Sequence, residues 1–494
     1  MEKKNVWETY GTKDLKALEK LCAEYRGFLD NGKTERECVD TIVNQAEANG
    51  YRELESLMKS GETLKTGDKV YSVWMNKSVA LFQIGKNSMT EGMNILGAHI
   101  DSPRLDVKQN PLYEEGGFAY LDTHYYGGVK KYQWVTIPLA IHGVVVKKDG
   151  TTIELNIGEN EDDPVFFVSD LLIHLAQEQL EKKAAKVIEG EALDIIIGNK
   201  PLVMEGKASK KTKKSAKSLA ANAEGEMDNA AETAENSAGK DAVKQGILRI
   251  LKETYDMEEE DFLSAELEVV PAGKAREAGF DRSMILAYGQ DDRVCAFTSL
   301  KAMLDTPVTE RTVCCILVDK EEIGSVGATG MQSHFFENMV AEVMNLCGEY
   351  SELNVRRCLA NSCMLSSDVS SAYDPSYASC FDRKNVAYMG NGMVFCKFTG
   401  ARGKSGSNDA NAEYLAHLRK IFEEKKIHFQ TAELGKVDVG GGGTIAYILA
   451  LYGMNVIDSG VAVLNMHAPW EATSKADVYE TYRGYRAFVE GASL

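Results

Sequence analysis

Four apolar segments of this chain end in a carboxylate or an imidazole, and this pattern constrains the fold more than any other feature. The segments are NILGAHID with His99 and Asp101, TVCCILVDKEE with Glu321 and Glu322, SCMLSSD with Asp368, and VAVLNMH with His467. Helical stretches at 294–304, 410–424 and 444–452 alternate with such strand-like runs. This alternation predicts a mainly parallel sheet covered by helices. In such a sheet the site lies beyond the carboxyl ends of the strands, so we expect the four ends to converge on one crevice.

The length of 494 residues predicts two domains. From about residue 105 to 285 the pattern changes to shorter strand-like runs with one helix near 168–188. We interpret 105–285 as a domain inserted into a larger one formed by 1–104 and 286–494. Within it, residues 205–242 have low complexity, with a lysine-rich half before an acidic, alanine-rich half. Such a segment buries too little apolar surface to offset its ordering entropy, which predicts a solvated loop.

Charge and composition exclude several kinds of partner. The formal net charge of −18 argues against nucleic acid, which requires a clustered positive surface, and against an anionic membrane. The first twenty residues lack the apolar core of a secretory signal, and no apolar run has the length of a membrane span. The ten cysteines show no CxxC spacing, which is typical of reduced thiols. We therefore expect a cytoplasmic protein.

The residue types at the strand ends suit a hydrolytic metal site. Imidazole and carboxylate together favour zinc or a similar divalent ion, whereas oxygen ligands alone favour magnesium or calcium. Asp101 follows His99 by two residues and can hold the far nitrogen of its ring. Glu321 and Glu322 are adjacent and point in different directions, so one can bind metal while the other acts as general base. Taken singly, the signals are weak: a lone HxD on a strand is not specific for metal, the glutamate pair also fits a solvated turn or a helix start, and Asp368 also fits a helix cap.

Six blocks of sequence, in order along the chain, resemble the aspartyl aminopeptidase family of two-zinc metallopeptidases, which includes the vacuolar aminopeptidase I type. The blocks are GAHIDSPRLD (97–106), GQDDR (289–293), VDKEEIGSVGATG (318–330), LSSDVSSAYDP (365–375), DVGGGGTIAYILA (438–450) and VLNMHAPWE (463–471). The resemblance implies an α/β fold: a three-layer zinc-peptidase-like domain with a mainly parallel central sheet, plus a β-rich dimerisation domain inserted at 105–285.

The resemblance also implies a role for each site residue. His99 and Asp368 match the terminal ligands of one zinc, and Glu322 and His467 match those of the other. Asp291 matches the carboxylate that bridges both metals, Glu321 the catalytic glutamate, and Asp101 the aspartate that supports His99. The family often has asparagine after the bridging aspartate. Here Asp292 follows, so ligation by Asp292 stays open.

Assembly is implied in the same way. Family members form dimers that build a dodecamer, and a histidine of the inserted domain enters a neighbouring subunit's site. VSDLLIHLAQ (168–177) resembles that segment, which makes His174 the expected residue. The alternative is a histidine satisfied within its own domain.

The implied activity is removal of the N-terminal residue, acidic or neutral, from peptides with a free N-terminus. It would use two divalent metal ions per subunit, zinc by resemblance, with cobalt or manganese as alternatives. Backbone N–H groups of GGGGT (440–444) are candidates for substrate contacts, and Arg402 and Lys404 for holding an acidic side chain. The alternatives are a two-metal deacylase or carboxypeptidase on the same frame, and a non-catalytic binding relative.

Overall fold

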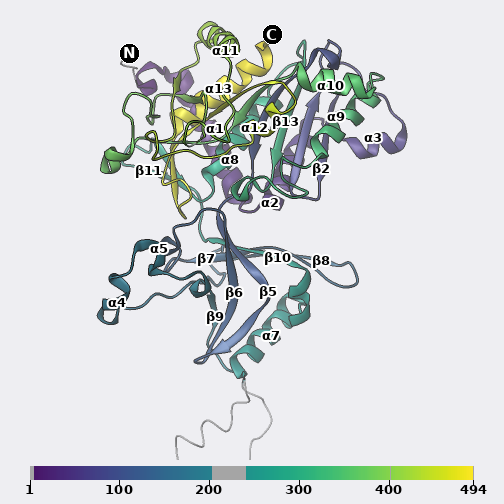
Figure 1. Cartoon of the computed structure of the whole chain (residues 1–494). Coiled ribbons are helices and arrows are strands. Elements are labelled where there is room, and N and C mark those ends of the chain that lie inside the picture. Colours follow the sequence, from purple (N-terminus) through teal and green to yellow (C-terminus); the bar gives the residue numbers. More distant parts are fainter. Residues whose placement is uncertain (1–4, 203–240, 401, 493–494) are drawn as a thin grey trace, which may run out of the picture. The chain divides into compact units, whose positions relative to one another are not determined.

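The computed structural model describes residues 5–202, 241–400 and 402–492. Its contacts divide the chain into two compact units. Unit 1 comprises Met1–Arg104, Tyr126–Lys130 and Gly273–Leu494, and unit 2 comprises Leu105–Tyr125 and Lys131–Ala272. Figure 1 labels the elements of both units. In the part of the chain that is described, no helix is both long and apolar enough to cross a membrane.

A nine-stranded sheet forms the centre of unit 1. In spatial order its strands are β1 (Arg52–Glu53), β2 (Lys69–Trp74), β3 (Ser78–Gln83), β13 (Thr312–Val318), β4 (Met93–His99), β14 (Cys363–Ser367), β18 (Asn455–Gly460), β16 (Met393–Cys396) and β17 (Phe429–Thr431). The four central strands, β13, β4, β14 and β18, run parallel. Their register pairs Val318 with His99, so β13 and β4 end side by side. The mainly parallel sheet predicted from the sequence is confirmed.

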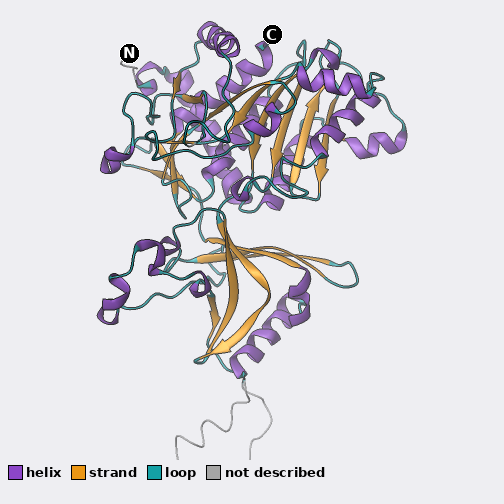
Figure 2. Ribbon diagram, viewed as in Figure 1, coloured by secondary structure: helices purple, strands orange, loops and turns teal. Residues whose placement is uncertain are grey.

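Both faces of this sheet are buried under helices (Figure 2). On β13, Val313, Cys315 and Leu317 enter one core, while the alternate residues Cys314, Ile316 and Val318 enter the other. The first core is covered by α1 (Thr12–Asn31), α2 (Glu35–Ala48), α8 (Gln290–Leu304), α11 (Ala412–Lys425) and α13 (Lys475–Gly491). The second is covered by α3 (Leu54–Ser60), α9 (Phe335–Leu346), α10 (Glu352–Ala360) and α12 (Ala446–Ala450). A strand buried on both faces requires a continuous apolar run, which explains TVCCILV. The three-layer architecture is confirmed.

A second, five-stranded sheet in unit 1 changes one expectation. Its strands are β11 (Arg276–Ala278), β12 (Met284–Ala287), β20 (Glu471–Ser474), β19 (Ala462–Leu464) and β15 (Ser370–Ser371). The strand before His467 is β19, so it does not belong to the same sheet as the three other strand ends. The chain leaves the central sheet after β18 at Gly460 and pairs β19 with β20 instead.

Unit 2 is built on a six-stranded sheet. Its order is β8 (Thr152–Ile157), β7 (Leu139–Val146), β10 (Ala265–Pro271), β5 (Arg104–Glu115), β6 (Phe118–Tyr126) and β9 (Ile195–Gly198), and α7 (Ala242–Tyr255) follows the strands in the same unit. The pairs β8–β7, β7–β10, β10–β5 and β6–β9 are antiparallel. The predicted low-complexity loop at 205–242 lies outside the described residues as far as residue 240.

The single helix predicted near 168–188 is wrong. The chain there forms only short turns: η4 (Ile173–Leu175), α4 (Gln177–Leu180) and α5 (Ala184–Val187). Extended backbone at Leu172 precedes η4, and extended backbone at Lys183 separates α4 from α5. The side chains of Leu172, Ile173 and Leu175 are exposed, so no apolar face packs to stabilise a longer helix. Isolated short helices are marginal in water without such packing.

Candidate active site

The predicted site residues of unit 1 come from five places in the fold. His99 is the last residue of β4, and Asp368 directly follows β14. Glu321 and Glu322 open the turn η7 (Glu321–Ile323), three residues after β13. Asp291 is the second residue of α8, and His467 lies in the loop between β19 and β20. Residues separated by up to 368 positions in the sequence are thereby brought together.

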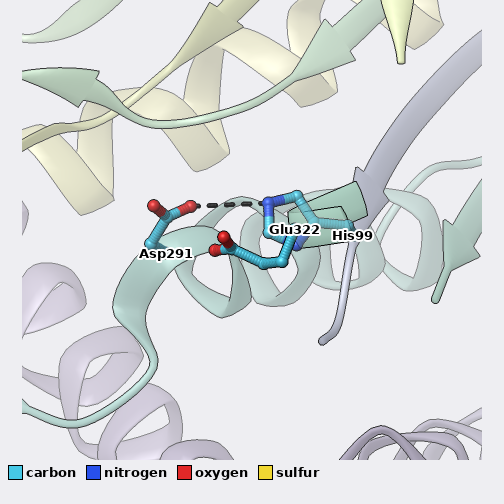
Figure 3. Close-up of side chains that lie close together, drawn as sticks. All are labelled: His99, Asp291 and Glu322. Carbon is cyan, nitrogen blue, oxygen red and sulfur yellow. Dashed lines mark ion pairs between the residues drawn. The ribbon is translucent and has the colours of Figure 1, made fainter. Parts of the chain in front are cut away.

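The carboxylate of Asp291 lies between two imidazoles. Its Oδ1 is 3.4 Å from Nε2 of His99, and its Oδ2 is 3.3 Å from Nε2 of His467. Figure 3 shows the first of these pairs, with the Glu322 carboxylate beside it. Burial alone would raise the pKa of Asp291, but the two histidines hold it well below its usual range. For His467 the effects have the opposite sign. Burial lowers its pKa, but the carboxylates of Asp291 and Glu322 outweigh burial and raise the pKa to about 10.

The two glutamates of η7 face different imidazoles. Oε2 of Glu322 is 3.6 Å from Nε2 of His467, and Oε2 of Glu321 is 3.9 Å from Nε2 of His99. The other oxygen of Glu322 is buried and has no hydrogen-bond partner among the described residues. Burial raises the pKa of Glu321 to about 7, with Asp101 and Asp291 adding to the increase and His99 opposing it.

Asp292 and Asp368 form a second group with His99. One ligand atom from each of the three residues lies within 4.8 Å of the others. The peptide bond between Asp291 and Asp292 is cis. Both carboxylate oxygens of Asp292 are buried without a hydrogen-bond partner in the described part of the chain. Burial raises the pKa of both aspartates well above the usual range; the charge of Asp291 adds to the rise at Asp292, and the charge of Asp292 adds to it at Asp368.

These residues fit a divalent metal site. His99, Asp291 and Glu322 also meet the 4.8 Å criterion, so His99 belongs to two overlapping groups. Buried carboxylates that face one another repel, and burying them is costly unless cations are near. Nitrogen and oxygen donors of this kind are those of catalytic zinc sites. The buried oxygens of Asp292 and Glu322 that accept no hydrogen bond from the described residues are suited to bind such a cation.

Asp101 connects several parts of the site. Its Oδ1 lies 3.2 Å from Nδ1 of His99, as expected, although the main-chain oxygen of Asp101 is also 3.0 Å from that nitrogen. The carboxylate further accepts the backbone N–H groups of Glu321 and Glu322, each at 3.2 Å. The hydroxyl of Tyr126, which the sequence did not indicate, donates to Oδ2 at 2.8 Å. Asp101 therefore orients both the histidine and the glutamate turn.

Glu471, the first residue of β20, holds two residues of the site, and the sequence did not indicate this role. It is 1% exposed. Its Oε1 accepts the backbone N–H of His467 at 2.7 Å, and its Oε2 accepts that of Asp291 at 3.0 Å. The only signal in the sequence is that Glu471 ends the block VLNMHAPWE.

A cavity of about 430 Å³ opens over the cluster. Asp291, Glu321, Glu322, Asp368 and His467 line it on one side. The remaining described lining is neutral and includes Ser370, Cys396, Thr399, Leu434, Gly441, Gly442, Gly443, Thr444 and Met466. The glycine-rich segment thus borders the same space as the acidic residues.

The other residues singled out in the sequence lie elsewhere. Arg402 and Lys404 line a separate cavity of about 340 Å³, which shares Thr399 and Leu434 with the first. Lys404 pairs with Asp409 at 2.9 Å. His174 is exposed in the turn η4 of unit 2.

Comparison with known proteins places this site in a family. The profile of the family described as "Aminopeptidase I zinc metalloprotease (M18)" matches residues 28–489. The chain belongs to this family. A curated relative from Clostridium acetobutylicum, named a probable M18 family aminopeptidase 1, is 58% identical over 488 residues, covering 99% of this chain and 98% of that protein. The M18 membership makes the chain a metalloaminopeptidase by class.

Solved structures of M18 proteins have the same fold. Aminopeptidase I from Clostridium acetobutylicum superposes with a TM-score of 0.87 at 56% identity, covering 99% of each chain. An M18 aminopeptidase from Thermotoga maritima gives a TM-score of 0.89 at 42% identity over the whole of both chains. A yeast aminopeptidase structure described as a dodecamer, at 19% identity, a TM-score of 0.71 and coverage of 96% and 99%, shares the fold.

Proposed function

We propose that this M18 protein removes single residues from the free N-terminus of peptides, using two divalent cations bound by the buried cluster. In this proposal His99 and Asp368 hold one cation, Glu322 and His467 hold the other, and Asp291 bridges them. The observation that carries the proposal is the position of the Asp291 carboxylate, with one oxygen toward each imidazole. Zinc is the expected metal from the family description, with cobalt or manganese as alternatives.

Glu321 is the proposed general base. Bound cations would lower the pKa of water and stabilise negative charge on the scissile carbonyl oxygen. Glu321 borders the cavity, and its backbone N–H is held by Asp101, so its carboxylate is fixed beside the cluster. It takes a proton from water and returns it to the departing amine. Asp101 holds the His99 ring in the orientation that turns Nε2 toward Asp291.

Asp292 is a further candidate ligand. Its two unsatisfied oxygens and its grouping with His99 and Asp368 support direct ligation or close approach to one cation. The number of divalent cations bound by Asp292→Asn separates these two roles. The number should fall if Asp292 is a direct ligand and stay unchanged if Asp292 only lies near the cation.

In this proposal the N-terminal residue that is removed has an acidic or a neutral side chain. Apart from the cluster itself, the described lining of the main cavity is neutral, which supports small or apolar side chains. Arg402 and Lys404 border the adjoining cavity, which supports an acidic group extending past Thr399 and Leu434. A series of substrates that differ only in the first residue decides between them.

We also propose that the chain forms a homo-oligomer, a dodecamer built from dimers, through unit 2 as the dimerisation domain. The exposed apolar side chains of Leu172, Ile173 and Leu175 support this, since such a patch is typical of an interface. In the proposed assembly His174, between them, enters a neighbouring subunit's site. Native mass spectrometry gives the subunit number, and His174→Ala should lower kcat without changing that number. A cytoplasmic location stays a prediction.

The test of the function is hydrolysis of aminoacyl-p-nitroanilides and their N-acetylated forms, each with Zn²⁺, Co²⁺, Mn²⁺ or chelator. We expect hydrolysis of the free amines only, abolished by chelator. Hydrolysis of the acetylated forms would instead indicate a deacylase, and release of C-terminal residues a carboxypeptidase. Metal binding without hydrolysis of any substrate would indicate a non-catalytic relative.

A further inference from the structure

A five-residue segment, Tyr126–Lys130, lies against the proposed metal site. The chain on both sides of it, Leu105–Tyr125 and Lys131–Ala272, forms unit 2, yet these five residues belong to unit 1. The segment starts at the last residue of β6 and precedes the short turn η3 (Lys131–Gln133). None of its residues is a proposed ligand. Its contacts with the site are of three kinds: a hydroxyl, a carbonyl and close backbone packing.

The hydroxyl belongs to Tyr126. It donates to Oδ2 of Asp101 at 2.8 Å, while the Tyr126 ring packs under the guanidinium of Arg104, 4.0 Å from the ring centre. The side chain is buried, so the hydroxyl has little freedom to move. Because Asp101 also faces Nδ1 of His99, the rotation of its carboxylate determines how the His99 ring is held. Tyr126 thus acts on His99 through Asp101.

The carbonyl belongs to Gly128. It lies 2.9 Å from Nδ1 of His467. A carbonyl oxygen only accepts hydrogen bonds, so Nδ1 of His467 carries the proton. In the neutral ring this leaves the lone pair on Nε2, the nitrogen that faces Asp291 and Glu322. A metal-binding histidine normally has its other nitrogen held in this way, which fixes both tautomer and ring orientation.

The backbone of Gly127 packs closely against Glu322, so a side chain there would press on the glutamate. Gly127 has φ +75°, and a Cβ there would lie 3.2 Å from Oε2 and 3.4 Å from Cβ of Glu322. A Cβ on Gly128 would lie 3.0 Å from Nδ1 of His467. The backbone of Gly127 and Gly128 therefore limits the positions of Glu322 and His467, the two residues proposed to hold the same cation.

We propose that Tyr126, Gly127 and Gly128 form a positioning segment of the metal site, although none of them binds metal. The inference rests on the proposed two-metal site. Through it, one short stretch of chain orients His99 by way of Asp101, limits the position of Glu322, and sets the tautomer of His467. In other proteins, substitution of a residue that holds a metal ligand typically lowers metal affinity about 10–100-fold. We expect a loss of about that size here.

Two variants and a matched control test this proposal. Tyr126→Phe removes the hydroxyl and keeps the ring. Gly127→Ala places a methyl group against Glu322. Gly117→Ala is the control, because Gly117 has φ +79° and no atom within 4 Å of an added Cβ. The Gly127 and Gly117 variants therefore carry the same backbone penalty, and only one of them touches the site.

The measurement is Zn²⁺ affinity of the full-length chain by competition with a chromogenic chelator, together with urea unfolding of the metal-free protein. We expect affinity to fall about 10–100-fold in Tyr126→Phe and Gly127→Ala and to stay at the wild-type value in Gly117→Ala. Equal affinities in all four proteins would overturn the inference while leaving the proposed function intact. A wild-type protein that binds no Zn²⁺ would overturn both.

Discussion

The buried carboxylate of Glu471 allows a sharp prediction. It accepts two backbone N–H groups, one from the proposed bridging residue Asp291 and one from the proposed ligand His467. We predict that Glu471→Ala destabilises the protein and also weakens metal binding. Both effects have the same cause, because the two residues lose the group that holds their backbone in place.

The magnitude follows from the two hydrogen bonds. Alanine leaves both N–H groups without their acceptor; the N–H of Asp291 is buried and that of His467 is partly buried. Each unsatisfied buried donor costs about 1–3 kcal/mol, so we expect a loss of about 2–6 kcal/mol in the free energy of unfolding. Changing a residue that supports metal ligands typically costs about 10–100-fold in metal affinity.

Asp477 provides a matched control. It is a buried carboxylate that accepts two backbone N–H groups, from Gly390 and Gly392, both at 2.7 Å. Neither glycine is among the proposed ligands. Asp477→Ala should therefore lose a similar unfolding free energy and keep wild-type metal affinity. Urea unfolding of the metal-free proteins gives the first quantity, and chelator competition gives the second.

Two outcomes would refute this reasoning. If Glu471→Ala and Asp477→Ala lose stability equally and both keep wild-type metal affinity, Glu471 has only a structural role. If Glu471→Ala loses no stability, the two hydrogen bonds do not contribute as described. Should the alanine variant fail to fold, Glu471→Gln retains one acceptor and should show smaller changes in the same direction.

Two further predictions concern acid–base groups. Glu321→Gln should lower kcat by about 10²–10⁴-fold, the usual contribution of a general base, with the metal content unchanged; a variant with wild-type kcat would exclude Glu321 from proton transfer. Asp458 is buried and accepts from the Thr444 hydroxyl at 2.5 Å, and burial raises its pKa from 3.8 to about 7. The folded state therefore binds more protons than the unfolded state between these values, so the stabilisation is complete below about pH 4 and is lost as pH rises through 7. Relative to Asp458→Asn, metal-free wild type should lose stability as the pH rises from 3.8 to about 7, with a slope of at most about 1.4 kcal/mol per pH unit; parallel pH profiles of the two proteins in urea unfolding would contradict this.

The centre of the large sheet could be predicted because its central strands are buried on both faces. A strand of this kind is mostly apolar, and the run 312–318 coincides with β13. The polar residue that ends each run then marks the carboxyl edge of the sheet. This reasoning located His99, Glu321, Glu322 and Asp368 without reference to any relative.

Other parts of the site left no local pattern. Asp291 opens a helix, where an acidic residue is ordinary, and only the resemblance indicated it. Tyr126 acts through Asp101, 25 positions away, and Glu471 reaches Asp291, 180 positions away, as well as the nearby His467, so no regular spacing along the chain indicates either residue. The helix predicted near 168–188 failed for another reason: Leu172, Ile173 and Leu175 are exposed, so no apolar face of these residues packs to support a helix.

The most direct test of the central claim is a metal titration of the metal-free chain, with hydrolysis of a free-amine aminoacyl-p-nitroanilide measured at each addition of Zn²⁺. The two-metal site predicts no activity without metal and a plateau at two equivalents per chain, with Asp291→Ala inactive throughout. A plateau at one equivalent, or hydrolysis by the metal-free protein, would contradict it.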